Sequence, residues 1–165
     1  MNSGRHSDRY LEKFNLLQWP PHTEMVCRKI AAAMRETAPQ TVAGPTTGGV
    51  ILAYEVGRQL GLRGIFAERV EGGGRSFQRD FHLVAGERVL IVDDVLTSGA
   101  SVRETIEAVR AAGGEPVGVG VLVDRSGGAV QFEGLPLYAA TEFSLQTYEP
   151  ADCPLCRAGV PLTVT

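Results

Sequence analysis

The segment RVLIVDDVLTSGAS, residues 88–101, joins the pattern of a buried strand to a polar turn. Four of its first five residues are apolar, and such an unbroken run is typical of a strand covered on both faces of a parallel sheet. Asp93 and Asp94 follow directly, and the next residues are mostly small, with hydroxyl groups and a glycine. Two adjacent carboxylates at the end of a buried strand need a polar partner. The segment therefore predicts a strand that ends at a ligand-binding site.

Helical and strand-like patterns alternate on both sides of this segment. Helices are expected at 22–38, 46–61 and 101–114, and strands at 41–45, 63–70, 88–94 and 115–125. Thr23 is the expected N-cap of the first helix, and Pro39 is expected to end it. The alternation predicts the α/β class, with a central, mostly parallel sheet flanked by helices. Right-handed crossovers would bring the carboxyl ends of the strands to one edge, where ligands of such sheets bind.

The composition bounds the class of protein. With 165 residues, 44% hydrophobic and 21% charged, the chain is expected to fold as one soluble domain over residues 1–165. It has no apolar run approaching about 18 residues, no secretory pattern near its start and only three cysteines, so we expect a reducing cytoplasm. A net charge of −3 predicts no binding to nucleic acid or to a membrane. Only Lys13 and Lys29 are lysines, which leaves arginines to bind anions.

The turn after the acidic pair has the composition of a phosphate site. Thr97, Ser98, Gly99 and the first amides of the next helix would offer hydroxyl and N–H groups to an anion. Asp93 and Asp94 would repel a phosphate unless they bind ribose hydroxyls, directly or through Mg²⁺. The pattern is not a Walker loop, and it fits a ribose 5-phosphate with free hydroxyls. A solvated strand end with an ordinary helix cap is the simpler alternative.

The stretch VLIVDDVLTSGAS, residues 89–101, resembles the phosphoribosyl pyrophosphate (PRPP) motif of the type I phosphoribosyltransferases. The resemblance implies that Asp93 and Asp94 hold the ribose hydroxyls, partly through Mg²⁺, and act as catalytic residues. It implies that PRPP is bound by the motif Val95, Leu96, Thr97, Ser98, Gly99, Ala100 and Ser101. The loop GPTTGG, residues 44–49, resembles the family's pyrophosphate loop and adds Thr46, Thr47 and Gly48, although a helix-entry turn is the alternative.

Basic residues between two expected strands are the candidates for stabilising the leaving pyrophosphate. Arg69 ends the strand at 63–70, where members of the family place basic residues, and is implied to bind PRPP and to act in catalysis. Residues 71–82 fall where the family has a mobile lid. Arg75, Arg79 and His82 are the lid candidates, and arginine suits a developing pyrophosphate charge. A solvated loop without a role is the alternative.

Two further stretches indicate which nucleobase would accept the ribose 5-phosphate. SGRHSDRY, residues 3–10, resembles the SGxxSxxY signature of orotate phosphoribosyltransferases, and VLVDRSGG, residues 121–128, ends where that family has an orotate-binding arginine. Arg125 lies 28 positions after Thr97, the separation expected for the two orotate-contacting residues. The tail TYEPADCPLCRAGVP, residues 147–161, is similar to the Thermus-like bacterial branch. An Arg125 paired with Asp124 at the surface is the alternative for this position.

The resemblance implies a function and an assembly. The chain would transfer the ribose 5-phosphate of PRPP to N1 of orotate, with Mg²⁺, as a homodimer. Its core would span about 22–145, and segments 1–21 and 146–165 would form a small hood. A phosphoribosyltransferase for a purine or another base, or a non-catalytic sensor of PRPP or nucleobases, stays open. Members of the family have a helix and a strand before the Ser-Gly pair, with a lysine where Asn2 stands, so a hood starting at Met1 would be incomplete.

Cys153 and Cys156 form a CxxC pair, which is half of a zinc knuckle. A structural zinc site needs four ligands, and the sequence has no second CxxC. His6, His22 and His82 are dispersed along the chain. The expected arrangement is a packed turn with two free thiols and a surface His6. Zinc held between two chains or by unusual partners is the alternative.

Overall fold

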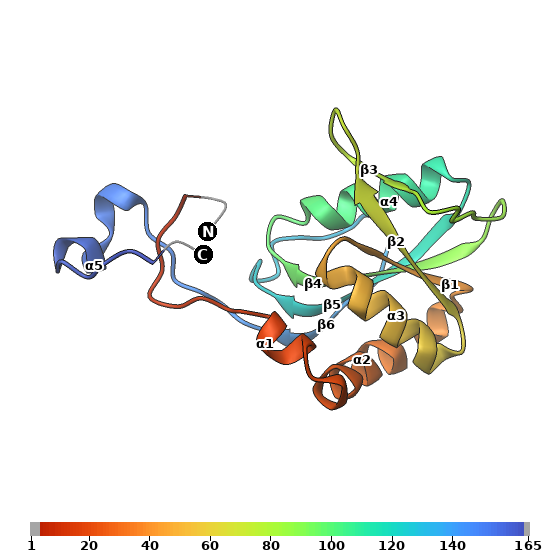
Figure 1. The fold of residues 1–165 in the computed structure, drawn as a ribbon, viewed down its shortest axis with the longest axis horizontal. Coiled ribbons are helices and arrows are strands. Elements are labelled where there is room, and N and C mark those ends of the chain that lie inside the picture. Colours follow the sequence, from red (N-terminus) through yellow and green to blue (C-terminus); the bar gives the residue numbers. More distant parts are fainter. Residues whose placement is uncertain (1–3, 164–165) are drawn as a thin grey trace.

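The computed structural model describes residues 4–163, and their centre is one six-stranded sheet in the order β3-β2-β1-β4-β5-β6 (Figure 1). The strands are β1 (Thr41–Pro45), β2 (Arg63–Arg69), β3 (Arg75–Phe77), β4 (Arg88–Leu96), β5 (Glu115–Asp124) and β6 (Leu137–Glu142). The edge strand β3 runs antiparallel to β2, and all other neighbours are parallel. The predicted α/β class with a mostly parallel sheet is confirmed.

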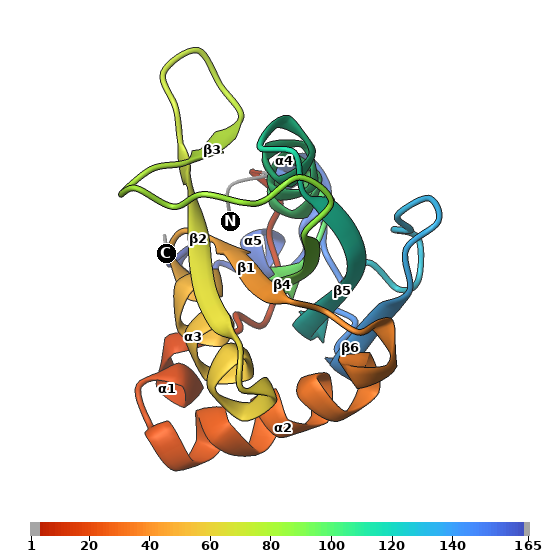
Figure 2. The same cartoon turned by 90° about the vertical axis from the view of Figure 1, so that its right-hand side faces the viewer.

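Helices cover both faces of this sheet (Figure 2). The α-helices are α1 (Phe14–Leu17), α2 (Pro20–Met34), α3 (Gly48–Leu60), α4 (Ala100–Ala111) and α5 (Pro154–Arg157), with 3-10 turns η1 (Arg35–Thr37) and η2 (Pro150–Asp152). Leu90 and Val92 of β4 pack into the core shared with α2 and α3, and Ile91 packs into the core under α4. Successive strand residues point to opposite faces, so the apolar run of β4 is explained by burial on both sides.

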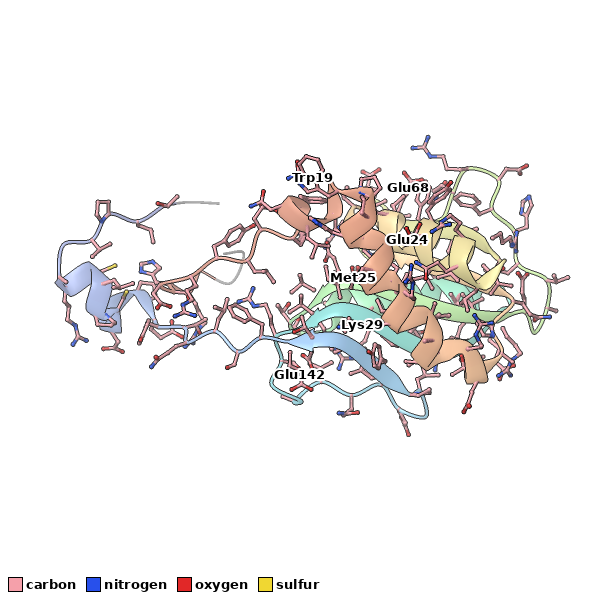
Figure 3. The ribbon with its side chains drawn as sticks, turned by 90° about the horizontal axis from the view of Figure 1, so that it is seen from below. Trp19, Glu24, Met25, Lys29, Glu68 and Glu142 are labelled. Carbon is pink, nitrogen blue, oxygen red and sulfur yellow. The ribbon has the colours of Figure 1, made fainter. Side chains whose placement is uncertain are left out.

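The outer side of α2 stays exposed. Met25 and Lys29 lie on the side of this helix that faces away from the sheet (Figure 3), whereas Ile30 and Met34 are buried in the core. The apolar spacing of residues 22–38 therefore predicted the helix and the burial of Ile30 and Met34, but Met25, which belongs to the same apolar pattern, is exposed. No helix in the described part of the chain is long and apolar enough to cross a membrane.

The first and last described segments of the chain lie together, away from the sheet (Figure 1). We call residues 4–10 and 146–163 the terminal arm. Its two segments join through an antiparallel bridge between His6 and Tyr148, in which each backbone N–H donates to the other's carbonyl at 2.9 Å. Residues 1–3, which include Asn2 and the serine of the SGxxS stretch, lie outside the described residues.

Several local expectations were wrong in detail. Helix α2 begins at Pro20 with Trp19 in the N-cap position, and the hydroxyl of Thr23 instead donates to the carbonyl of Leu17 at 3.2 Å. Proline fits the first helical position because it needs no N–H partner there. The helix gives way to η1 and then to a left-handed Ala38, one residue before Pro39. Strand β4 continues two residues past the acidic pair, and the half-exposed β6 had no strand pattern strong enough to be predicted.

Candidate active site

Asp93 is a buried carboxylate near the carboxyl end of β4. Its Oδ2 accepts a hydrogen bond from the hydroxyl of Ser101 at 2.6 Å, and its Oδ1 accepts one from the N–H of Asp94 at 2.8 Å. Burial, and next the charge of Asp94, raise the pKa of Asp93 to about 6. The carboxyl group of Asp93 is thus held by Ser101 in the first turn of α4 and by the backbone of its own strand.

Asp94 faces the loop that begins α3. Its Oδ2 lies 3.8 Å from Nζ of Lys13, and its Oδ1 accepts the N–H of Val95 at 2.6 Å. A Cβ atom added to Gly48 would lie only 1.8 Å from Asp94 Oδ2. Glycine at position 48 is therefore what allows the two segments predicted to bind PRPP to approach each other.

The loop at residues 44–49 is held from two sides. A Cβ on Gly44 would lie 2.2 Å from the carbonyl oxygen of Gly49, so the loop closes on itself tightly. The N–H of Thr46 donates to the carbonyl of Ala67 in β2 at 3.1 Å, and its hydroxyl accepts a hydrogen bond from Arg75 at 3.1 Å. The peptide bond between Thr46 and Thr47 is cis. This arrangement puts small side chains and backbone groups next to Asp94.

The turn at 97–101 leads from β4 into α4. Thr97, Ser98 and Ala100 are exposed, while Gly99 is buried with a φ of 77° in the N-cap position. A Cβ on Gly99 would lie 2.6 Å from Nη1 of Arg103, whose guanidinium donates to the carbonyl of Ser98 at 2.7 Å. The exposed start of α4 therefore combines backbone N–H groups with the positive end of a helix dipole, as an anion site requires.

Arg125 lies beside this turn because of the pairing of β4 with β5. Leu96 pairs with Asp124, and the N–H of Arg125 donates to the carbonyl of Leu96 at 2.8 Å. Because of this strand register, Thr97 and Arg125 lie close together although 28 positions separate them in the sequence. Oδ1 of Asp124 accepts the N–H of Ser126 at 2.6 Å, whereas Nε of Arg125 is buried with no hydrogen-bond partner among the described residues. A buried donor without a partner is costly, so this atom is suited to receive a ligand acceptor.

The lid candidates separate into a fixed and an exposed group. The side chain of Arg75 is only 3% exposed, and its guanidinium donates to Glu104, to Thr46 and to the carbonyl of Ala67, each at 3.1 Å. Arg75 therefore belongs to the walls of the site. Arg79 is 67% exposed and pairs with Glu68 at 3.0 Å.

The remaining basic candidates are also on the surface. His82 is 78% exposed, with Nε2 2.9 Å from a carboxylate oxygen of Asp80. Arg69 is exposed at the end of β2, opposite Arg75 in the β2–β3 register. The structure thus places Arg69 and Arg75 at one place in the sheet, and Arg79 and His82 farther along the chain that follows β3.

Three residues of the site were not predicted from the sequence. Lys13 approaches Asp94, Glu104 anchors Arg75, and Arg103 supports the turn at 97–101. Lys13 stood out as one of only two lysines, but nothing near it in the sequence indicated its partner. Glu104 and Arg103 lie on the exposed side of an amphipathic helix pattern and gave no signal of their own.

Comparisons with known proteins agree with this geometry. Residues 15–134 match the phosphoribosyl transferase domain family. The chain is 46% identical over 162 residues to an orotate phosphoribosyltransferase of Caldanaerobacter subterraneus and 48% identical over 161 residues to one of Pelotomaculum thermopropionicum. Each match covers 98% of this chain and 84% of the relative. The chain therefore belongs to the phosphoribosyltransferases and, within them, to the orotate phosphoribosyltransferase family.

Solved structures share the architecture. An orotate phosphoribosyltransferase from Aeropyrum pernix superposes with a TM-score of 0.72 at 25% identity, covering 87% of this chain and 84% of that one. An adenine phosphoribosyltransferase from Thermoanaerobacter pseudethanolicus gives the same TM-score of 0.72 at 17% identity, covering 84% of this chain and 94% of that one. The second likeness concerns the fold alone.

Proposed function

We propose that this chain transfers the ribose 5-phosphate of PRPP to N1 of orotate, giving orotidine 5′-phosphate and pyrophosphate. The observation that carries the proposal is the strand register that sets Arg125, with its unpartnered buried Nε, beside the turn that follows Asp93 and Asp94. A planar guanidinium is a suitable partner for the carboxylate of orotate. The names and the high coverage of the similar enzymes support the same activity.

The proposed position of PRPP follows from the two loops. The turn at residues 97–101 and the start of α4 receive the 5-phosphate, and the loop at 44–49 receives the pyrophosphate. The ribose between them lies against the acidic pair of β4. Arg75, held by Glu104, is placed to meet the pyrophosphate at Thr46.

The donor set fits Mg²⁺, which prefers carboxylate, phosphate and water oxygens. Asp93 and Asp94 are the residues that would hold it. Both oxygens of Asp93 already accept hydrogen bonds, so Asp94 is the more available ligand once Lys13 moves aside. When bound, Mg²⁺ neutralises charge on the departing pyrophosphate.

The chemistry needs little covalent help from the protein. The bond between C1 and the pyrophosphate oxygen breaks, and positive charge develops on the ribose ring. N1 of orotate forms the new bond with inversion and gives up its proton to water or to the departing pyrophosphate. Asp94 stabilises the positive ribose, while Arg75 and Arg69 stabilise the negative leaving group. Arg125 and Thr97 orient the base so that N1 faces C1. Arg79 and His82 belong to a segment that closes over the reactants and excludes water.

The surroundings of the catalytic core belong to the same proposal. The core at about 22–145 carries the PRPP site, and the segments 1–21 and 146–165 form a hood. Homodimerisation would bring the exposed segment after β3 to a neighbouring site. The three free cysteines are consistent with a reducing cytoplasm as the place of action.

The direct test is a spectrophotometric assay of orotate consumption with PRPP and Mg²⁺. Uracil, adenine, hypoxanthine and xanthine are offered in parallel. Turnover of orotate alone is expected. Turnover of a purine in its place would contradict the role of Arg125, and binding of PRPP without turnover of any base would favour a sensor over an enzyme.

A further inference from the structure

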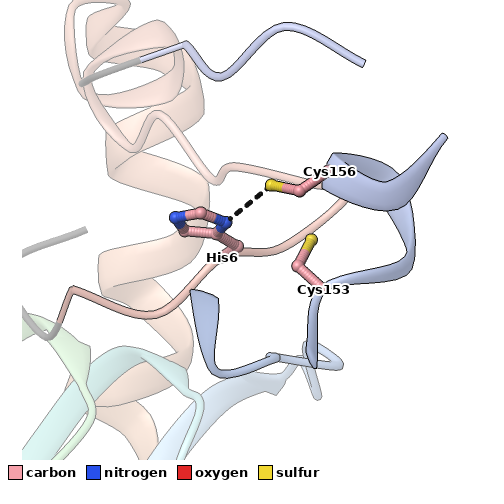
Figure 4. Close-up of side chains that lie close together, drawn as sticks. All are labelled: His6, Cys153 and Cys156. Carbon is pink, nitrogen blue, oxygen red and sulfur yellow. Dashed lines mark hydrogen bonds between the residues drawn. The ribbon is translucent and has the colours of Figure 1, made fainter. Parts of the chain in front are cut away.

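A second cluster of reactive side chains lies outside the proposed active site, in the terminal arm. One ligand atom each of His6, Cys153 and Cys156 lies within 4.8 Å of the other two. Nδ1 of His6 is 3.2 Å from Sγ of Cys156 (Figure 4). The histidine comes from one end of the described chain and the cysteines from the other.

Contacts on both sides of His6 hold it in this position. The backbone bridge to Tyr148 is flanked by the hydroxyl of Ser7, which donates to the carbonyl of Gln146 at 2.8 Å, and by Arg5, which donates to Thr147 at 2.9 Å. These bonds fix two chain segments that have no regular strand around them. His6 thus faces the CxxC turn because of the backbone pairing, and not because of one isolated contact.

The cysteines present their sulfur atoms to the same place. Cys153 precedes α5 and is 1% exposed, Cys156 is exposed within α5, and both are free thiols. Figure 4 shows both sulfur atoms on the side of the turn that faces the imidazole. A turn that only packed against the chain would have no need to bring two thiols and an imidazole together.

Two sulfur atoms and one imidazole nitrogen form the donor set that Zn²⁺ prefers. With bond lengths of about 2.0–2.3 Å, ligand atoms of a tetrahedral zinc site are separated by roughly 3.3–3.8 Å. The observed separations, from 3.2 Å to within 4.8 Å, need only small side-chain adjustments to reach this geometry. A cavity of about 450 Å³ between the two segments leaves room for water in the fourth position.

We propose that His6, Cys153 and Cys156 bind one Zn²⁺ ion per chain and that a water molecule completes the tetrahedron. The ion joins the first described residues to the tail and fixes the stretch 4–10 against it. This role is structural, and its test does not depend on the proposed transferase reaction. It takes up the zinc alternative that the sequence left open beside two free thiols and a surface histidine.

The test measures metal content of the full chain, purified under reducing conditions without added chelator. Elemental analysis is expected to find one zinc per chain. Exchange with Co²⁺ should give the visible d–d bands of a tetrahedral ion and thiolate-to-metal charge-transfer absorption. His6→Ala, Cys153→Ser and Cys156→Ser should each lower zinc retention, while the matched controls His22→Ala and Cys27→Ala retain it.

A second experiment, limited trypsin digestion, tests whether the ion fixes the terminal arm. Removing zinc with a strong chelator should speed tryptic cleavage after the exposed Arg9 and Arg157, without changing the circular dichroism of the core. His6→Ala should be cleaved at the fast rate with or without chelator. A reduced, folded chain that holds no zinc and gives no cobalt spectrum would overturn the proposal, as would equal zinc loss in Cys27→Ala. A Cys153–Cys156 disulfide in protein prepared under reducing conditions would overturn it too.

Discussion

Gly48→Ala tests whether the close approach of the α3 loop to Asp94 is what positions this carboxylate. The new Cβ would lie 1.8 Å from Asp94 Oδ2, whereas an ordinary contact needs about 3.4 Å, so the carboxylate oxygen must move by roughly 1.6 Å. Misplacing a reacting group by about 1 Å can cost 10²-fold in rate. We therefore expect kcat/KM for PRPP to fall about 100-fold, equivalent to about 2.7 kcal/mol of transition-state stabilisation.

The same substitution should leave the fold intact. Gly48 is the first residue of α3, and alanine is favoured over glycine inside helices by about 1 kcal/mol. Urea denaturation should therefore give a free energy of unfolding within about 1 kcal/mol of the parent. Val50→Ala, two residues further along the helix, is the matched control and should change neither quantity appreciably.

A double-mutant cycle decides whether the loss acts through Asp94. In the background of Asp94→Ala, the oxygen that Gly48→Ala displaces is absent, so the second substitution should lower kcat/KM by less than about 5-fold. Steady-state kinetics of all four proteins give the coupling. Additive losses in the two backgrounds would refute the reasoning, because the new methyl group would then act on something other than Asp94.

Three further substitutions test other parts of the site. Arg125→Gln should raise the KM for orotate by about 10–100-fold, the value of a lost charge-assisted hydrogen bond, with little change in the KM for PRPP; equal changes in both would contradict its role. Burial and the charge of Asp94 raise the pKa of Asp93 to about 6, so the folded chain retains a proton that the unfolded chain releases from about pH 4 upward. The stability that protonated Asp93 contributes is present below about pH 4 and is lost as the pH rises through 6. Asp93→Asn should therefore raise the free energy of unfolding at pH 7 by up to about 3 kcal/mol. The same substitution should abolish turnover. Urea titrations in EDTA should show that gain shrinking at pH 4.5, and a less stable Asp93→Asn at pH 7 would be the contrary result. Arg75→Gln should lower kcat/KM for PRPP at least tenfold more than Arg79→Gln, since only Arg75 contacts the loop at 44–49.

The sequence predicted those parts of the site that follow one another along the chain. The apolar run before Asp93 and the small residues after it indicated both the buried strand and the exposed turn that leads into the next helix. The separation of Thr97 and Arg125 was also usable, because the register of β4 with β5 converts that separation into proximity.

Contacts between distant segments could not be predicted in this way. Arg75 was expected in a mobile lid at 71–82, yet pairing of β3 with β2 turns its guanidinium toward Thr46 and Glu104. The approach of His6 to the CxxC turn likewise depends on a backbone bridge across most of the chain. No local pattern of side chains encodes such a bridge.

The ion pair between Arg75 and Glu104 would make α4 a spacer between the two proposed phosphate sites. The helix presents its first amides at Ala100, and Glu104 lies four residues, or about 6 Å, further along the same rigid element. In the proposed complex, one phosphate binds at the helix start and the other beside the arginine that Glu104 holds. In that complex, the rigid helix would help the two loops to keep a constant separation between the two charges. Such a spacer favours a donor whose phosphate groups are one pentose apart over any shorter or longer diphosphorylated sugar.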